Sequence, residues 1–199
     1  MTISEITAYF EEMCNILNYN LFEGSLPPFC VVISGASNNL STTYSRQDVW
    51  SKNGVGLREI VLSSEILNLN IYDAVVVLIH EMIHHYCYSR GLKDTSRGNT
   101  YHNKIFRQEA EKRFLIVEYS NKTGFTILKP SEKLKKIIDT LGFQENWNGV
   151  KTVKPIAKNR DNGIRKYVCP SCGNSVRATK DVNIACLDCN KKMVIEKRM

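Results

Sequence analysis

The pentad His80–His84 (His-Glu-Met-Ile-His) has the residue types and the spacing of a zinc site. If the surrounding apolar run is helical, His80 and His84 lie one above the other on a single face, because they are four residues apart. Two imidazoles in this arrangement can bind one zinc ion, and Glu81 would lie close enough to act on a water molecule. A buried helix whose histidines have no ligand role is the alternative. However, three of the chain's four histidines lie in or beside this pentad, which favours the metal site.

A catalytic zinc takes three protein ligands and keeps a fourth position for water, so a third ligand must come from outside the pentad. The extended metzincin pattern requires Gly at position 87 and His at position 90, where this chain has Cys87 and Arg90. The remaining candidates are His102, expected in the first turn of the next helix, and Glu109, about two turns further along. His102 is favoured because it is the only histidine outside the pentad helix. A histidine at a helix start with no special role is the alternative.

Four of the seven cysteines form two Cys-x-x-Cys pairs, Cys169 with Cys172 and Cys186 with Cys189, separated by 13 residues. Each pair can place two thiolates on one tetrahedral metal, and together they predict a closed structural zinc site. A redox disulfide is the alternative, but a reducing compartment favours zinc. The other cysteines lie singly among apolar residues and are expected to be core thiols: Cys14, Cys30 and Cys87.

The charge of the chain is concentrated in its C-terminal part. Residues 151–199 carry 12 Lys and Arg against 4 Asp and Glu, whereas residues 1–150 carry 15 against 16. This imbalance favours DNA or another nucleic acid as partner of the C-terminal module, and a merely solvated basic surface is the alternative. No apolar run approaches the ~20 residues of a membrane span, so no membrane partner is expected. The first residues lack the basic segment of a secretory signal, so we expect a cytoplasmic protein that is not secreted.

Apolar periodicity and capping residues predict the elements that must position these groups. His85 lies about 100° around the pentad helix from His84, so we expect it at the surface or in a supporting role. Residues 146–166 lose apolar periodicity, which predicts a domain over 1–145 and a basic linker with the four-cysteine module over 146–199. The expected elements are a helix over 2–24 with a Thr2–Glu5 capping box, a strand over 29–34, a loop or ragged hairpin over 35–54, a strand over 55–62, a helical turn from 63, the pentad helix from about Asp73 to Gly91 with Asn70 as N-cap, a helix over 101–114 capped by Asn99 or Thr100, a strand over 125–128 and a helix over 131–141.

Several stretches, taken in order, resemble the SprT-like zinc metallopeptidase family, which includes the DNA–protein crosslink protease Spartan. They are Asn18–Pro27, Ile60–Ser63, Leu78–His84, His102–Phe106 with its His-x-x-x-Phe spacing, Tyr167–Cys172 and Cys186–Cys189. In two respects the chain departs from the family. Tyr101 and Asn103 flank the third histidine, where the family often has Gly. Tyr167 is the only aromatic residue between positions 150 and 199, so the C-terminal module supplies few side chains for stacking on bases.

The resemblance implies two zinc ions. It assigns His80, His84 and His102 as ligands of a catalytic zinc, Glu81 as the catalytic acid–base, and the four cysteines as ligands of a structural zinc. It also implies an α+β fold, in which a zincin-like metallopeptidase domain with a small antiparallel sheet is followed by a small β zinc ribbon.

The expected function is that of a zinc-dependent metalloendopeptidase whose substrates are proteins, in particular DNA-associated or DNA-crosslinked ones. One alternative is a non-enzymatic zinc-containing protein that binds nucleic acid or has a regulatory role. Glu81 argues against it, because a purely structural metal has no use for a carboxylate beside its first ligand. Another alternative is a metallopeptidase with no nucleic-acid role. The sequence does not specify the oligomeric state.

Overall fold

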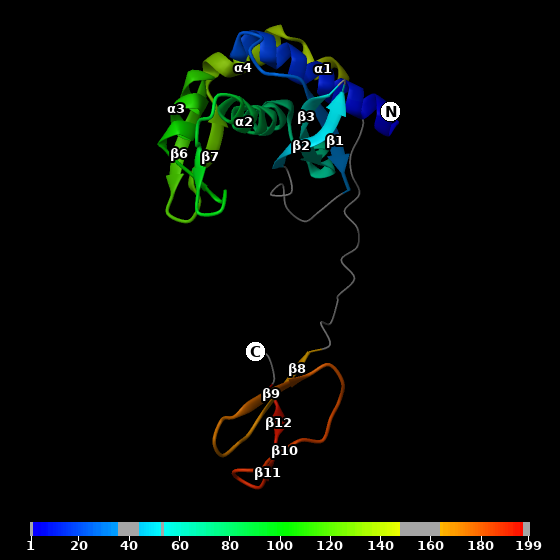
Figure 1. Cartoon of the computed structure of the whole chain (residues 1–199), viewed down its shortest axis with the longest axis vertical. Coiled ribbons are helices and arrows are strands. Elements are labelled where there is room, and N and C mark those ends of the chain that lie inside the picture. The colour runs from blue at the N-terminus through cyan, green and yellow to red at the C-terminus, as the bar shows by residue number, and fades with distance from the viewer. Residues whose placement is uncertain (1, 36–43, 53, 148–163, 197–199) are drawn as a thin grey trace. The chain divides into compact units, whose positions relative to one another are not determined.

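The computed structural model describes residues 2–35, 44–52, 54–147 and 164–196. These belong to two compact units, one within residues 1–154 and the other within residues 155–199 (Figure 1). The first is a mixture of helices and strands and the second contains strands. Most of the expected boundary over 146–166 falls on residues 148–163, which lie outside the described residues.

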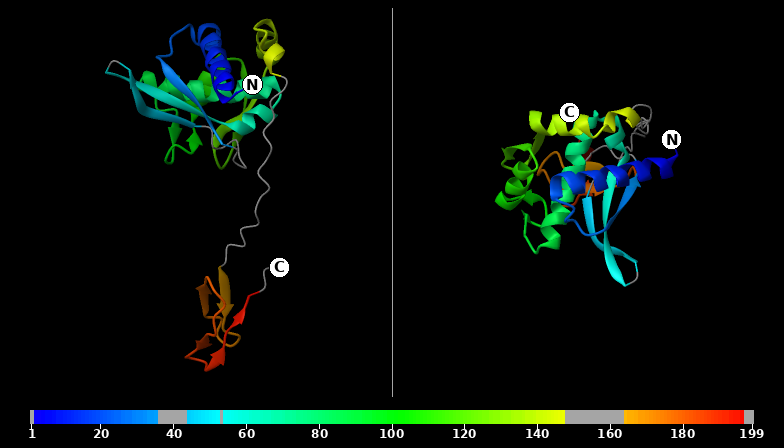
Figure 2. Two further views of the ribbon diagram at one scale, coloured as in Figure 1. Left: turned by 90° about the vertical axis from the view of Figure 1, so that its right-hand side faces the viewer. Right: turned by 90° about the horizontal axis from the view of Figure 1, so that it is seen from above.

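The first unit has a central helix between two small sheets (Figure 1). The central helix is α2, the sheets have the strand orders β1-β3-β2 and β4-β5-β7-β6, and α1 and α4 both lie on the side of α2 at the top of Figure 1. Figure 2 shows the same helices from two further directions. The elements are α1 (Ile3–Phe22), β1 (Phe29–Ser34), β2 (Tyr44–Lys52), β3 (Val55–Ser63), the 3-10 helix η2 (Ser64–Asn68), α2 (Ile71–Ser89), β4 (Thr95–Ser96), β5 (Tyr101–His102), α3 (Lys104–Lys112), β6 (Leu115–Ser120), β7 (Gly124–Pro130), α4 (Glu132–Thr140) and the 3-10 helix η3 (Phe143–Asn146).

Both sheets of the first unit are mixed. Strand β3 runs parallel to β1 and antiparallel to β2, while β5 runs parallel to β7. The expectation of an antiparallel sheet is therefore wrong for this unit. The reason is that β3 inserts between β1 and β2, so the first two strands do not form a hairpin with each other. In the undecided stretch 35–54, residues 44–52 form β2 and pair with β3 across an irregularity between Arg46 and Trp50.

Local signals account for the two long helices. Thr2 and Glu5 form the predicted capping box of α1, and the Asn70 side chain accepts from the Asp73 amide at 3.0 Å at the start of α2. Helix α2 is apolar on nearly all sides because other elements cover it on both flanks. No helix among the described residues is long and apolar enough to cross a membrane. The buried apolar residues of α2 are Ile71, Ala74, Val75, Val76, Leu78, Ile79, Met82, Ile83 and Cys87.

The helix expected over 101–114 begins later than predicted. Helix α3 starts at Lys104, and its N-cap is Asn103, whose Oδ1 accepts from the amides of Ile105 at 2.7 Å and Phe106 at 3.4 Å. The predicted caps Asn99 and Thr100 belong instead to the turn between β4 and β5. His102 therefore lies on a strand, and its placement in the first helical turn is wrong.

The other expected elements of the first unit are confirmed. The strand over 125–128 lies within β7, and the helix over 131–141 is α4. Helix α4 has Ser131 as its N-cap, and Gly142 follows it with φ of 72°. Strand β6 was not predicted.

The second unit consists of short strands. Its strands are β8 (Arg165–Val168), β9 (Ser175–Ala178), β10 (Ala185–Cys186), β11 (Lys191–Lys192) and β12 (Val194–Ile195). Strands β12, β8 and β9 form an antiparallel sheet in that order, and β10 pairs with β11. Among the described residues of this unit, the buried apolar ones are Tyr167, Cys169, Cys186 and Met193. So small a core needs a further crosslink, which the cysteines can supply through a metal.

Candidate metal centre

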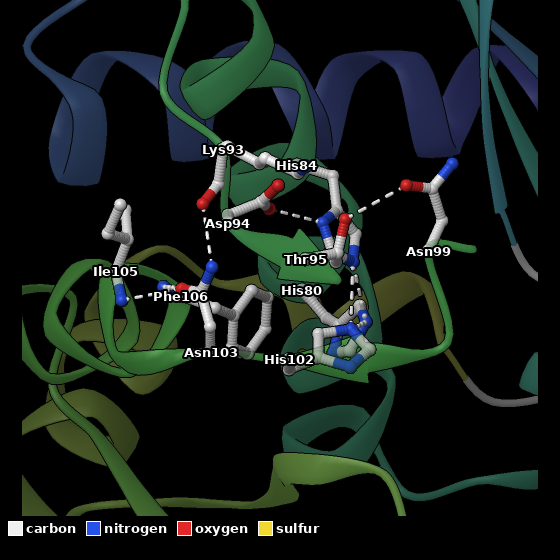
Figure 3. Close-up of polar contacts among 10 residues, drawn as sticks. All are labelled: His80, His84, Lys93, Asp94, Thr95, Asn99, His102, Asn103, Ile105 and Phe106. Atoms are coloured by element: carbon white, nitrogen blue, oxygen red, sulfur yellow. Dashed lines mark hydrogen bonds and ion pairs between the residues drawn. The ribbon is translucent and has the colours of Figure 1, made fainter. Parts of the chain in front are cut away.

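Three histidine side chains converge at one point of the first unit. His80 and His84 come from successive turns of α2, and His102 comes from β5 (Figure 3). The Nε2 atoms of His80 and His84 are 3.1 Å apart. The Nε2 atom of His102 lies 3.2 Å from that of His80 and 3.1 Å from that of His84. The three nitrogens thus form a nearly equilateral triangle.

These distances match a shared metal ion. Ligand nitrogens at the ~2.0–2.1 Å typical of zinc, at tetrahedral angles, would be about 3.3 Å from one another. Each histidine contributes the same ring atom, and all three atoms lie within 4.8 Å of one another. The donor set therefore fits a tetrahedral ion that keeps one position for another ligand.

The partner of His84 determines which nitrogen of that ring is free. Nδ1 of His84 lies 2.5 Å from Oδ2 of Asp94, a carboxylate oxygen that can only accept while ionised. Nδ1 therefore carries a proton, and Nε2 is the nitrogen of this ring that faces the other two histidines and can bind a metal.

Burial favours the neutral, ligating form of the other two histidines. It lowers the pKa of His80 well below its usual range, and the charges of His84 and His102 lower that pKa further. Burial, followed by the charge of His84, lowers the pKa of His102 to about 4. Both rings are thus deprotonated at neutral pH, as metal binding requires.

Glu81 is buried beside its neighbour His80, with only 4% of its surface exposed. Burial raises the pKa of Glu81 to about 7, although the charges of His84 and Arg58 oppose this effect. A carboxyl group with a pKa near the working pH can both take and give a proton. A dication bound nearby would lower this pKa again.

Phe106 forms one wall of the histidine cluster. It is fully buried on α3, and its ring centroid lies 4.9 Å from that of His80, 5.1 Å from that of His84 and 4.5 Å from that of His102. The ring restricts the orientation of all three imidazoles and excludes water from that side. The His-x-x-x-Phe spacing contained this residue, but its contact with all three histidines could not be read from the spacing.

Comparison with protein-family models matches residues 10–122 to the SprT-like family. The match covers more than half of the chain and includes every residue of the histidine cluster. The chain belongs to the SprT-like family. Neither a search of curated proteins nor a search of solved structures finds a match.

Membership of the SprT-like family indicates a metallopeptidase-like domain in the first unit. His85 is 1% exposed and its Nε2 lies 2.9 Å from the carbonyl oxygen of Pro27, so of the two positions expected for it the surface one is wrong. Glu109 binds Arg113 at 2.7 Å and Lys112 at 2.6 Å, and it does not join the histidine cluster.

The four cysteines lie beyond the SprT-like match and form a second candidate metal site. The Sγ atoms of Cys169, Cys172, Cys186 and Cys189 all lie within 4.8 Å of one another. Cys172 Sγ and Cys186 Sγ are 3.6 Å apart, close to the ~3.8 Å expected for two sulfurs on one zinc and too far for a disulfide. Backbone amides of Cys172 and Ser171 lower the pKa of Cys169 to about 7, which favours the thiolate.

Proposed function

We propose that this SprT-like protein is a zinc-dependent metalloendopeptidase with a catalytic zinc held by His80, His84 and His102. The observation that carries the proposal is the triangle of Nε2 atoms at 3.1–3.2 Å with the buried carboxyl of Glu81 beside it. A structural site would need neither an open coordination position nor a carboxyl group of raised pKa. We further propose that the four cysteines hold a second, structural zinc.

The residues of the first site divide the work of amide hydrolysis. When bound, zinc supplies a Lewis acid that polarises the scissile carbonyl and acidifies water. Glu81 takes a proton from water while the oxygen of that water bonds to the carbonyl carbon of the substrate. Glu81 then gives that proton to the amine nitrogen as the carbon–nitrogen bond breaks. His80, His84 and His102 would hold the ion as neutral imidazoles, and Phe106 keeps their rings in place.

Replacing Glu81 with Gln tests this assignment. We expect E81Q to keep two zinc ions per chain and to lose peptide cleavage by about 10²–10⁴-fold, the contribution typical of a general acid–base. The matched control is Glu111→Gln, at an exposed glutamate of α3. His102→Ala should reduce the metal content from two ions to one. Wild-type cleavage by E81Q would contradict the mechanism, and a wild-type protein that binds zinc without cleaving any protein would favour the non-enzymatic alternative.

We also propose that the second unit directs the peptidase to proteins on DNA. The support is its charge, because residues 155–199 carry 10 Lys and Arg against 4 Asp and Glu. Lys191 and Lys192 on β11 are exposed and can contact phosphates without disturbing the buried core. Tyr167 is buried, so contacts with the phosphate backbone are expected to outweigh base stacking.

A salt titration of DNA binding by the full chain tests this proposed role of the second unit. Each phosphate contact contributes about −0.9 to the slope of log affinity against log salt on duplex DNA. The double variant K191E/K192E should therefore reduce the slope by about 2. The control is K133E/K136E, at two exposed lysines of α4. A slope near zero for the wild-type protein would contradict DNA binding by the second unit and favour a metallopeptidase with no nucleic-acid role.

A further inference from the structure

We propose that Asp94 is a positioning residue of the metal centre, which orients His84 and ties the pentad helix to the strand that carries His102. Asp94 lies in the segment between α2 and β4 and is buried, with 8% of its surface exposed. The inference rests on the proposed metal site but not on the proposed peptidase activity.

The first contact of Asp94 is with a ligand ring. Its Oδ2 accepts from Nδ1 of His84 at 2.5 Å, where 12% of its own side chain and 19% of that of His84 are exposed. This bond fixes the ring orientation and places the proton of the neutral ring on Nδ1, so Nε2 is the nitrogen available to the ion. A carboxylate behind a ligand imidazole also increases its basicity and hence its affinity for the ion. Within the described part of the chain, Asp94 is the one carboxylate bonded to a ring nitrogen of the three histidines.

The second contact is through the main chain and reaches the third ligand. The carbonyl oxygen of Asp94 accepts from the amide of Asn103, next to His102, at 3.0 Å. The Asn103 side chain donates to the carbonyl of Lys93 at 2.7 Å, and Thr95 pairs with His102 across β4 and β5. Residues 94–103 thus form a loop closed at its base by Asp94 (Figure 3).

These contacts give Asp94 two functions that a single substitution can separate. The Asp94 side chain orients the His84 ring. The Asp94 backbone carbonyl holds the segment that carries His102, and a side-chain substitution leaves this carbonyl in place. Asp94→Asn keeps the size and a carbonyl acceptor but loses the negative charge, whereas Asp94→Ala also loses the bond to Nδ1. If the side chain positions the ligand, zinc affinity should fall in the order Asp, Asn, Ala.

The experiment uses the full chain labelled with ¹⁵N at histidine, which gives ring signals from only four residues. Zinc binding is followed through the rings of His80, His84 and His102, in competition with a chelator of known affinity. His85 is an internal reference, because its Nε2 lies against the Pro27 carbonyl away from the cluster. We expect D94A to weaken zinc binding by about 10–100-fold and to shift the His84 ring away from the Nδ1–H tautomer. D94N should show a smaller loss.

The control is Asp139→Asn, at an exposed carboxylate of α4 that accepts from the Tyr72 hydroxyl at 2.7 Å and from the Gln144 side chain at 2.8 Å. D139N should leave zinc affinity and the four ring signals unchanged. Wild-type zinc affinity in both D94N and D94A would overturn the proposal, as would weaker folding of both variants with an unchanged His84 tautomer. If D94A does not fold, D94N alone decides. A wild-type protein that binds no zinc at its histidines would instead refute the proposed function.

Discussion

Gly124 offers the sharpest test of how the third ligand is held. It begins β7 and lies opposite His102 in the parallel pairing of β5 and β7. Its φ is +78°, and a Cβ added there would lie 2.0 Å from the carbonyl oxygen of His102. The neighbouring Thr123 carbonyl accepts from the His102 amide at 2.8 Å. Gly124→Ala must therefore displace the backbone that carries His102.

The cost has two parts. A non-glycine residue in the left-handed region costs about 1–2 kcal/mol. Relief of an overlap with a packed backbone costs a further ~1–3 kcal/mol. We therefore expect G124A to lower the free energy of unfolding by about 2–5 kcal/mol. Because the shift moves a ligand, zinc affinity at the histidine cluster should also fall, by about 10–100-fold as for other supporting residues.

Gly98 provides a matched control for the conformational part. It lies between β4 and β5 with φ of +66°, and a Cβ there would meet nothing within 4 Å. G98A should therefore cost about 1–2 kcal/mol in stability and leave zinc affinity unchanged. Chemical denaturation of both variants, with zinc competition on the folded proteins, measures the two effects. Equal losses of stability and unchanged zinc affinity in both variants would refute the reasoning.

Three further predictions follow from other contacts. Removing zinc with a chelator, or replacing Cys172 with Ser, should unfold the second unit and leave the first folded, because the core of the second unit is so small. Backbone amide NMR signals would show which unit has unfolded. Glu109→Gln should lower stability at pH 7 by about 3–5 kcal/mol, because it removes the carboxylate that balances the charge of the buried Arg113 guanidinium. Burial raises the pKa of Glu109, but Lys112 and Arg113 outweigh it and hold that pKa below its ordinary value of 4.5. The stability supplied by Glu109 is therefore present above about pH 4.5 and lost as pH falls through the lowered pKa, so wild type and E109Q should converge under acid denaturation. Asn103→Ala should cost about 1 kcal/mol through loss of the α3 cap, measured by thermal unfolding against N68A on the exposed end of η2.

The parts of the site that sequence predicts are those set by neighbours in the chain. Two histidines four residues apart in a capped apolar run can meet on only one face, so His80 and His84 could be placed before any fold was known. His102 could be chosen as the third candidate ligand because histidines are scarce in the chain, but its secondary structure could not be predicted. Asn103, one residue after His102, is the N-cap of α3 in place of the predicted caps Asn99 and Thr100. The helix therefore begins after His102.

The parts that sequence could not predict depend on pairings between distant segments. Gly124 meets His102 only because β5 and β7 run parallel, and nothing in the two-residue strand β5 predicts that partner. The mixed first sheet has the same origin, since β3 takes the place beside β1 that a hairpin partner would have taken. Asp94 is one of several acidic residues after the pentad, and only the closed loop that follows it brings its carboxylate to His84.

This division explains where the metal centre should be most sensitive to substitution. Helix geometry fixes the separation of His80 and His84, and the buried packing of α2 supports it on both flanks. His102 lies on a strand of two residues, paired with Thr95 on one side and Gly124 on the other. So short a strand has few hydrogen bonds of its own, so its position depends on both neighbours. Substitutions at these neighbours should therefore weaken metal binding before they unfold the domain, whereas substitutions inside α2 should do both together.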